Sequence, residues 1–205
     1  IVLLVVLLMA VIVGAIGAVI GSGGAANSAE DYTYQAQVSE QTESYRDMVV
    51  DYCEKYGIDD YVDLCLAVIE QESGGNPPDV MQTEQSYYNV NPPIDTAEES
   101  IDCGTHELSD CLTKAKSKSP NDIKGISLAL QGYNFGNGYI DWALKNYGCY
   151  SKENAEIFSQ KMCVELGYDS YGDVEYVPHV LRYYIANPET TVTNESANSI
   201  LKELK

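Results

Sequence analysis

The sequence is poor in basic residues. It has 12 lysines and arginines against 31 aspartates and glutamates, which gives 205 residues a formal net charge of −19. A nucleic-acid-binding protein needs a basic surface that replaces the counterions of the phosphates. The charge balance therefore excludes a large nucleic-acid interface, and we expect no nucleic-acid partner.

Patterns that bind metal ions are also lacking. The two histidines, His106 and His179, are isolated, and no two cysteines have the Cys-x-x-Cys spacing of a zinc site. The acidic pairs Asp59-Asp60 and Glu98-Glu99 lack the alternating oxygen ligands of a calcium loop. We expect no metal ion and no other cofactor, and we interpret both histidines as structural or surface residues.

One long apolar run opens the sequence. Residues 1–21 are apolar or glycine, and a helix of this length can cross a bilayer core of about 30 Å. We predict a single-pass transmembrane helix here. The hydrophobic part of a cleaved signal peptide, which is usually shorter, is the alternative that the small residues between Gly14 and Ala18 leave open. In either case the rest of the chain is expected outside the cytoplasm.

Composition divides the remainder of the chain. Residues 22–40 are rich in Gly, Ala, Ser, Gln and acidic residues, which predicts a flexible linker. Residues 41–187 have enough length and apolar content for one domain, and residues 188–205 form a polar tail or the start of another linker.

Six cysteines are present, an even number that permits up to three disulfides in an exported protein. The sequence does not fix their pairing, although pairs near in sequence are favoured. The six are Cys53, Cys65, Cys103, Cys111, Cys149 and Cys163.

Apolar residues recur at helical spacing throughout the domain, and no run alternates as a strand would, so the predicted fold class is mainly α. Helix starts are indicated by Asp59 or Asp60, by Asp95 or Thr96 and by Ser151, and helix ends by Gly57 and Gly74. Helices are predicted at about 45–56, 59–73, 96–116, 121–133, 139–146, 152–166 and 173–185. The helix at 59–73 is apolar nearly all round, so it should be central.

Glu72 is the strongest candidate for chemistry. It lies at the end of this apolar helix, where partial desolvation raises the pKa of a carboxyl group towards the range of a proton donor. A single poised acid suits cleavage of a glycosidic bond. The alternatives are a solvated carboxylate at a helix end, and Glu70 as the acid on another face of the same helix.

Three ordered motifs carry a family resemblance. Gln71-Glu72-Ser73-Gly74-Gly75, Met81-Gln82 and Tyr133-Asn134-Phe135-Gly136 together resemble the lysozyme-like muramidase domain of bifunctional cell-wall hydrolases from Gram-positive conjugative elements. That domain is related to goose-type lysozymes and soluble lytic transglycosylases. The resemblance runs from about residue 45 to 184, and it implies a lysozyme-like helical fold.

The resemblance also implies roles for single residues. Glu72 would be the general acid that protonates the leaving oxygen of the β-1,4 bond between N-acetylmuramic acid and N-acetylglucosamine. Ser73, Gln82, Tyr133 and Asn134 would contact the substrate. From the residues alone, Ser73 is equally a helix cap, Gln82 an exposed side chain and Asn134 a helix stop.

Two features of this site remain open in the sequence. Gly132 stands where the family more often has alanine. A second catalytic carboxylate cannot be selected among Asp79, Glu84 and Asp95, and the related transglycosylases need none because the N-acetyl group of the substrate takes its place. Both hydrolysis and transglycosylation are therefore retained, and we favour hydrolysis.

The partners implied by the resemblance are peptidoglycan glycan strands and a type IV secretion or conjugation apparatus, with the membrane bound through residues 1–21. Local opening of the wall would be the task. The alternatives are a non-catalytic peptidoglycan-binding or scaffold module and a disulfide-stabilised adhesin. Seventeen tyrosines and one tryptophan are compatible with glycan binding through aromatic faces.

Overall fold

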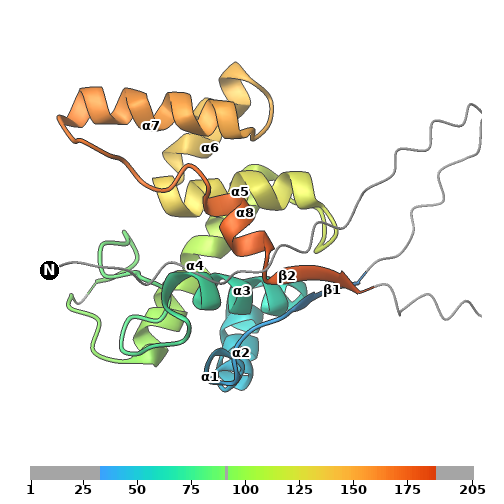
Figure 1. Ribbon diagram of the computed structural model, residues 1–205. Coiled ribbons are helices and arrows are strands. Elements are labelled where there is room, and N and C mark those ends of the chain that lie inside the picture. The colour runs from blue at the N-terminus through green and yellow to red at the C-terminus, as the bar shows by residue number, and fades with distance from the viewer. Residues whose placement is uncertain (1–32, 91, 188–205) are drawn as a thin grey trace, which may run out of the picture. The chain divides into compact units, whose positions relative to one another are not determined.

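The computed structural model describes residues 33–90 and 92–187, which are mainly helical as predicted (Figure 1). No helix in these residues is long and apolar enough to cross a membrane. The predicted membrane helix at 1–21 and the tail at 188–205 lie outside the described residues. In chain order the elements are β1 (Thr33–Ala36), α1 (Glu40–Glu43), α2 (Arg46–Tyr56), the 3-10 turn η1 (Asp59–Tyr61), α3 (Val62–Ser73), α4 (Ala97–Ala115), α5 (Ile123–Phe135), α6 (Gly138–Asn146), α7 (Lys152–Leu166), α8 (Tyr176–Leu181) and β2 (Tyr184–Asn187).

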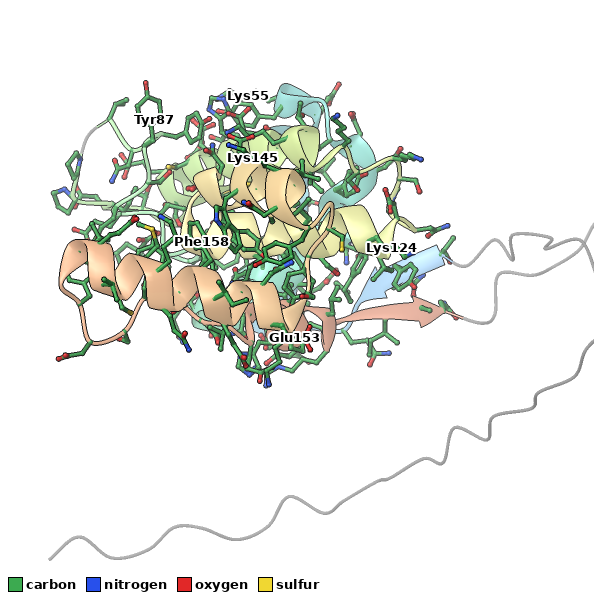
Figure 2. All side chains as sticks on the ribbon, turned by 90° about the horizontal axis from the view of Figure 1, so that it is seen from above. Lys55, Tyr87, Lys124, Lys145, Glu153 and Phe158 are labelled. Atoms are coloured by element: carbon green, nitrogen blue, oxygen red, sulfur yellow. The ribbon has the colours of Figure 1, made fainter. Side chains whose placement is uncertain are left out.

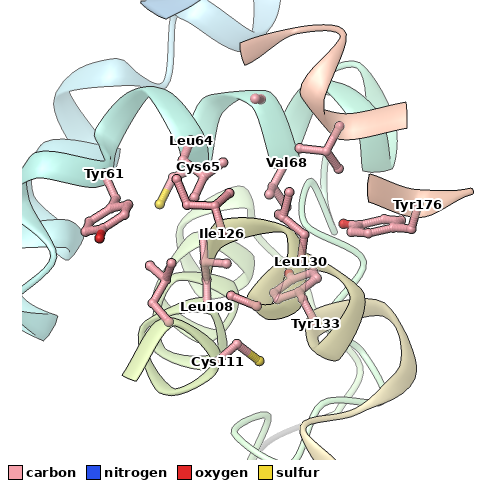
Figure 3. Packing of buried hydrophobic residues seen from close by; sticks show 14 of the residues in the cluster. Tyr61, Leu64, Cys65, Val68, Leu108, Cys111, Ile126, Leu130, Tyr133 and Tyr176 are labelled. Carbon is pink, nitrogen blue, oxygen red and sulfur yellow. The ribbon is translucent and has the colours of Figure 1, made fainter. Parts of the chain in front are cut away.

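Helix α3 lies at the centre of the fold. All six residues from Leu64 to Ile69 are fully buried, because no polar face interrupts this stretch. The helix contacts α1, α2, α8 and both strands. Figure 3 shows the core running along α3 from Tyr61 at one end to Tyr133 and Tyr176 at the other. The last turn of α3 therefore leaves the core at the end where these two tyrosines lie.

Local signals set most helix ends. Gly57 and Gly74 end α2 and α3 in the left-handed conformation, with φ of 68° and 62°. Thr96 caps α4 and Ser151 caps α7, each in a reciprocal capping box. The predicted capping of α3 by Asp59 or Asp60 is wrong, because both lie within the 3-10 turn and the N-terminus of α3 has no side-chain cap.

A two-stranded sheet is the main departure from the predicted elements. Residues 33–36, expected in the linker, pair antiparallel with residues 184–187, which overlap the end of the helix predicted at 173–185. Thr33 lies opposite Asn187 and Ala36 opposite Tyr184, and the rings of Tyr34 and Tyr184 stack with centroids 5.0 Å apart. β1 alternates in burial over only four residues and β2 does not alternate, so their long-range pairing rather than a sequence pattern defines them.

One aromatic side chain of α7 makes several ring contacts with its neighbours. Phe158 lies on the side of α7 that faces α6 (Figure 2). Its ring lies 5.7 Å from that of Phe135, 5.2 Å from Tyr139 and 5.1 Å from Trp142, measured between centroids. Ring contacts of this kind join α5, α6 and α7 into one layer.

The predicted disulfides are not formed in the structure, where all six cysteines are free thiols. Cys53 and Cys65 lie in contact and buried, but their sulfur atoms are 3.5 Å apart, against about 2.05 Å in a disulfide. Cys103 and Cys111 lie eight positions apart on α4, a separation of about 12 Å along the helix axis, which no disulfide spans.

Gly132 allows α5 to pack closely on α6. A β-carbon at this position would lie 2.4 Å from Cγ1 of Ile140. We expect Gly132→Ala to lower the free energy of unfolding by about 1–3 kcal/mol, the usual cost of overpacking a core. Gly138→Ala is the matched control, because a β-carbon on this α6 glycine meets nothing within 4 Å. Urea unfolding of both variants checks this, and equal stabilities would show that Ile140 moves aside without cost.

Candidate active site

Glu72 occupies the last turn of α3 and is half-buried. Burial raises the pKa of its carboxyl to about 7. The hydroxyl of Tyr176 donates a hydrogen bond to Glu72 Oε1, which opposes this rise, and the negative charges of Asp79, Asp173 and Glu107 add to it. A large fraction of Glu72 therefore keeps its proton at neutral pH, as a general acid requires.

Glu70, two residues earlier, has the opposite environment. Its Oε2 accepts hydrogen bonds from Ser39 Oγ at 2.8 Å, from the Ser39 backbone N–H at 3.2 Å and from Thr42 Oγ1 at 2.5 Å. Burial alone would raise the pKa of Glu70, but the hydrogen bonds outweigh it and the pKa is lowered. Glu70 is thus an ionised anchor for α1, and Glu72 is the better proton donor.

A cavity of about 440 Å³ lies in front of Glu72. Its volume falls within the range of about 300–1,000 Å³ that is usual for small-molecule sites. The lining combines two carboxyl groups, three side-chain amides and three aromatic rings. Its residues are Glu72, Gln82, Gln85, Ser86, Glu107, Tyr133, Asn134, Phe135, Gly136, Tyr171 and Gly172.

Tyr133 fixes the loop that enters the cavity. Its hydroxyl donates a hydrogen bond of 2.9 Å to the backbone carbonyl of Met81. Its ring stacks on that of Tyr176 with centroids 6.4 Å apart, at the end of the core visible in Figure 3. Gln82, which follows Met81, has a positive φ of 53°, and its side-chain amide donates to the backbone carbonyl of Asp79 at 3.0 Å. Tyr133 and Gln82 therefore both reach the cavity wall beside Glu72.

Asn134 ties the cavity wall to the segment before α8. Its Oδ1 accepts a hydrogen bond of 2.7 Å from the backbone N–H of Asp173. The buried Gln131, one turn earlier on α5, donates to the backbone carbonyl of the same residue at 2.9 Å. Asn134 thus lines the cavity and also holds a loop in place.

Gly172 lets that loop approach α5. It has a φ of 57°, and a β-carbon there would lie 2.4 Å from the ring of Phe135. The neighbouring Tyr171 donates its hydroxyl to the backbone carbonyl of Phe135 at 2.8 Å. These contacts clamp the loop against the end of α5, and α8 then begins at Tyr176, within reach of Glu72.

Ser73 is not among the residues that line the cavity. Its hydroxyl donates to the backbone carbonyl of Val80 at 2.8 Å and accepts from the backbone N–H of Gly75 at 3.1 Å. The side chain therefore closes the turn that follows α3, which matches the capping alternative for this serine.

The three carboxylates considered as second catalytic groups also lie outside the cavity lining. Asp79 Oδ1 accepts from Ser100 Oγ at 2.7 Å and from the Thr83 backbone N–H at 2.8 Å, so it organises its own loop. Glu84 and Asp95 are exposed.

Two residues of the site, Tyr176 beside Glu72 and Glu107 in the cavity lining, were not predicted from the sequence. Tyr176 bonds to Glu72, which is 104 positions away in the sequence, and patterns of neighbouring residues do not predict such a contact. Glu107 lies four residues from Cys103 and four from Cys111, both buried, so it interrupts an apolar stripe of α4. That interruption is the sequence signal that marks Glu107.

Both histidines make packing or polar contacts. The ring of His106 lies between those of Tyr56, on which it stacks, and Tyr88, which is tilted, with centroids 4.3 and 4.0 Å away. His179 Nδ1 lies 2.6 Å from Asp173 Oδ2. Within residues 33–90 and 92–187, no group of three or more His, Cys, Asp or Glu side chains is placed to hold a metal ion.

Comparison with known proteins places the chain in a family. A family model described as lysozyme-like matches residues 39–194. The bifunctional muramidase/DL-endopeptidase CwlT of Bacillus subtilis is 36% identical over 146 residues, which cover 71% of this chain and 42% of CwlT. A pneumococcal vaccine antigen A homologue of Streptococcus pyogenes is 31% identical over 120 residues, 58% of each chain.

A solved structure shares the fold. The crystal structure of a lipoprotein-like protein of the NLP/P60 family from Staphylococcus aureus superposes with a TM-score of 0.63 and 30% identity, over 81% of this chain and 60% of that one. The chain thus spans about half the length of these relatives. Because the family model covers most of the chain, including the motifs around Glu72, the chain belongs to the lysozyme-like family.

Proposed function

We propose that the chain is a peptidoglycan muramidase that cleaves the β-1,4 bond between N-acetylmuramic acid and N-acetylglucosamine. The observation that carries this proposal is the carboxyl of Glu72, with a pKa near 7, at the wall of a cavity of about 440 Å³. The relative CwlT is described as a muramidase and endopeptidase, and this chain matches 42% of its length.

Glu72 would act as general acid. Its proton would pass to the glycosidic oxygen as the bond to the anomeric carbon breaks, which lets the sugar leave as a neutral alcohol. The hydroxyl of Tyr176 would then stabilise the carboxylate that remains, since it already donates to Oε1. This contact also fixes the orientation of the carboxyl before the reaction.

Sugar binding would depend on neutral groups. The amides of Gln82, Gln85 and Asn134 and the rings of Tyr133 and Tyr171 line the cavity. Amides bind hydroxyl and N-acetyl groups, and aromatic faces pack against sugar rings. Electrostatic attraction would contribute little, because a chain of charge −19 repels anionic wall polymers.

A non-catalytic peptidoglycan-binding module is the principal rival. Such a module has no use for a desolvated carboxyl, because burial without a cationic partner destabilises the ionised form. Asp79, Asp173 and Glu107 add further negative charge around Glu72. That environment favours an acid that turns over substrate.

We also propose that residues 1–21 tether the enzyme to the membrane, with the catalytic domain outside the cytoplasm, and that it opens the wall for a conjugation or secretion apparatus. This part rests on the apolar run and the family resemblance. Protease treatment of intact cells stripped of wall is the test, and protection of the domain would contradict it.

Glu72→Gln should lower the release of muropeptides from purified peptidoglycan by about 10²- to 10⁴-fold, the usual contribution of a general acid. Glu70→Gln is the matched control. It disturbs the anchor of α1 and lowers stability, but below its melting temperature it should release the same products. Mass spectrometry should find reducing muramic acid ends from the native chain. If a folded sample bound the cell wall but released no product that depended on Glu72, the non-catalytic binding module would be the remaining function.

The pH dependence of kcat/KM should follow Glu72. The acid must be protonated, so activity should fall tenfold per pH unit above about pH 7. Tyr176→Phe removes a hydrogen bond that lowers the pKa of Glu72, so this falling limb should move to higher pH. Tyr171→Phe is the matched control. It removes a hydroxyl that donates to the backbone carbonyl of Phe135 and not to Glu72, so the falling part of its pH profile should stay in place. If the falling part of the Tyr176→Phe profile stayed in place or moved to lower pH, Glu72 would not be the acid that sets it.

A further inference from the structure

Glu107 is a second carboxylate in the same cavity as Glu72. The two come from different helices, Glu72 from the end of α3 and Glu107 from the middle of α4. Of the Asp and Glu side chains in the described part of the chain, these two alone are among the residues that line this cavity. Glu107 is half-buried on a stripe whose neighbours are buried, which is an unusual place for a carboxylate without a cationic partner.

We propose that Glu107 is the general base of the reaction, and this inference rests on the muramidase function proposed for Glu72. A water molecule would donate one proton to Glu107 while its oxygen bonds to the anomeric carbon. At the same time the bond from that carbon to the leaving oxygen breaks, and the proton of Glu72 passes to that oxygen. One water is consumed, one glycosidic bond is cleaved, and the anomeric configuration inverts.

The volume of the cavity leaves room for the attacking water. Inverting glycosidases hold their two carboxyl groups about 6.5–9.5 Å apart so that water fits between base and sugar, whereas retaining enzymes hold them about 5–5.5 Å apart. A cavity of about 440 Å³ with one carboxyl on α3 and the other on α4 has room for both a sugar unit and this water.

The surroundings of the two carboxyls assign the proton to Glu72. Burial raises the pKa of both, but Glu72 also faces the negative charges of Asp79, Asp173 and Glu107. Glu107 faces the charge of Asp110, and a hydrogen bond from Ser86 lowers its pKa. A hydrogen bond from Tyr176 also lowers the pKa of Glu72, but Glu72 faces more negative charges, and the charge of Glu107 is one of those that favour the protonated form of Glu72.

Other carboxylates in the region are engaged elsewhere. Asp79 accepts hydrogen bonds from Ser100 and from its own loop through both oxygens. Asp173 accepts from the backbone N–H of Glu175 and contacts His179. Neither side chain lines the cavity, so neither is placed to activate a water beside the sugar.

The first test uses the unmodified protein. Proton NMR of glycan fragments during the first minutes of digestion should show the α anomer of the new muramic acid end, because a base-activated water inverts the β linkage. The β anomer, or an anhydro end, would overturn the proposal. This measurement does not depend on the folding of any variant.

The second test uses variants. Glu107→Gln should lower kcat by about 10²- to 10⁴-fold with little change in KM and an unchanged melting temperature. Glu84→Gln, a change of the same kind on an exposed residue outside the cavity lining, should keep native kcat. In Glu107→Ala, sodium azide should restore turnover and give an α-glycosyl azide, which mass spectrometry detects, because azide attacks without a base.

The outcomes separate the two proposals. Product release that is unaffected by Glu72→Gln would remove the muramidase function itself. Release that depends on Glu72 but not on Glu107 would keep that function and remove the base. Loss of activity in Glu107→Gln with no azide adduct from Glu107→Ala would reduce Glu107 to a packing residue and overturn the inference.

Discussion

The hydrogen bond from Tyr176 to Glu72 depends on most of the fold. It joins residues 104 positions apart. Glu72 is desolvated because α3 is the central helix, and Tyr176 reaches it because the loop at residues 171–173 is clamped to the end of α5. If either support were lost, Glu72 would become an ordinary solvated carboxylate at a helix end, ionised at neutral pH. The proposed chemistry therefore requires the packing of α3, α5 and α8 together.

Glu70 and Glu72 show how one short segment can serve two purposes. The two residues are two positions apart, so their side chains leave different faces of α3. Glu70 meets hydroxyl and backbone N–H donors near α1, whereas Glu72 meets two tyrosine rings. Hydrogen-bond donors stabilise the carboxylate of Glu70, whereas desolvation stabilises the protonated form of Glu72. Glu70, which anchors α1, and Glu72, the candidate acid, thus lie two residues apart on different faces of α3, and their environments favour different protonation states.

Features with a local cause were predictable from the sequence. The apolar stretch of α3, the glycine ends at Gly57 and Gly74 and the capping boxes of α4 and α7 each depend on residues within a few positions. Glu72 could be chosen because its neighbours along the chain account for its desolvation. The pairing of β1 with β2, the contact of Tyr176 and the course of the loop after Ser73 could not be predicted, since each depends on a distant partner. Glu107 was predictable only in part. Its position on an apolar stripe of α4 is visible in the sequence, but the cavity that it lines is formed by residues far apart in the chain.

The pairing of β1 with β2 has a mechanical consequence. Thr33 lies opposite Asn187, so the first and last described residues lie next to each other. Tension applied through both ends would separate the two strands starting at Thr33 and Asn187, and it would break their hydrogen bonds one after another. The load would fall on the strands first and spare α3, α5 and α8 until the strands had separated. If the chain is tethered as proposed above, the strands would therefore separate before the cavity is deformed.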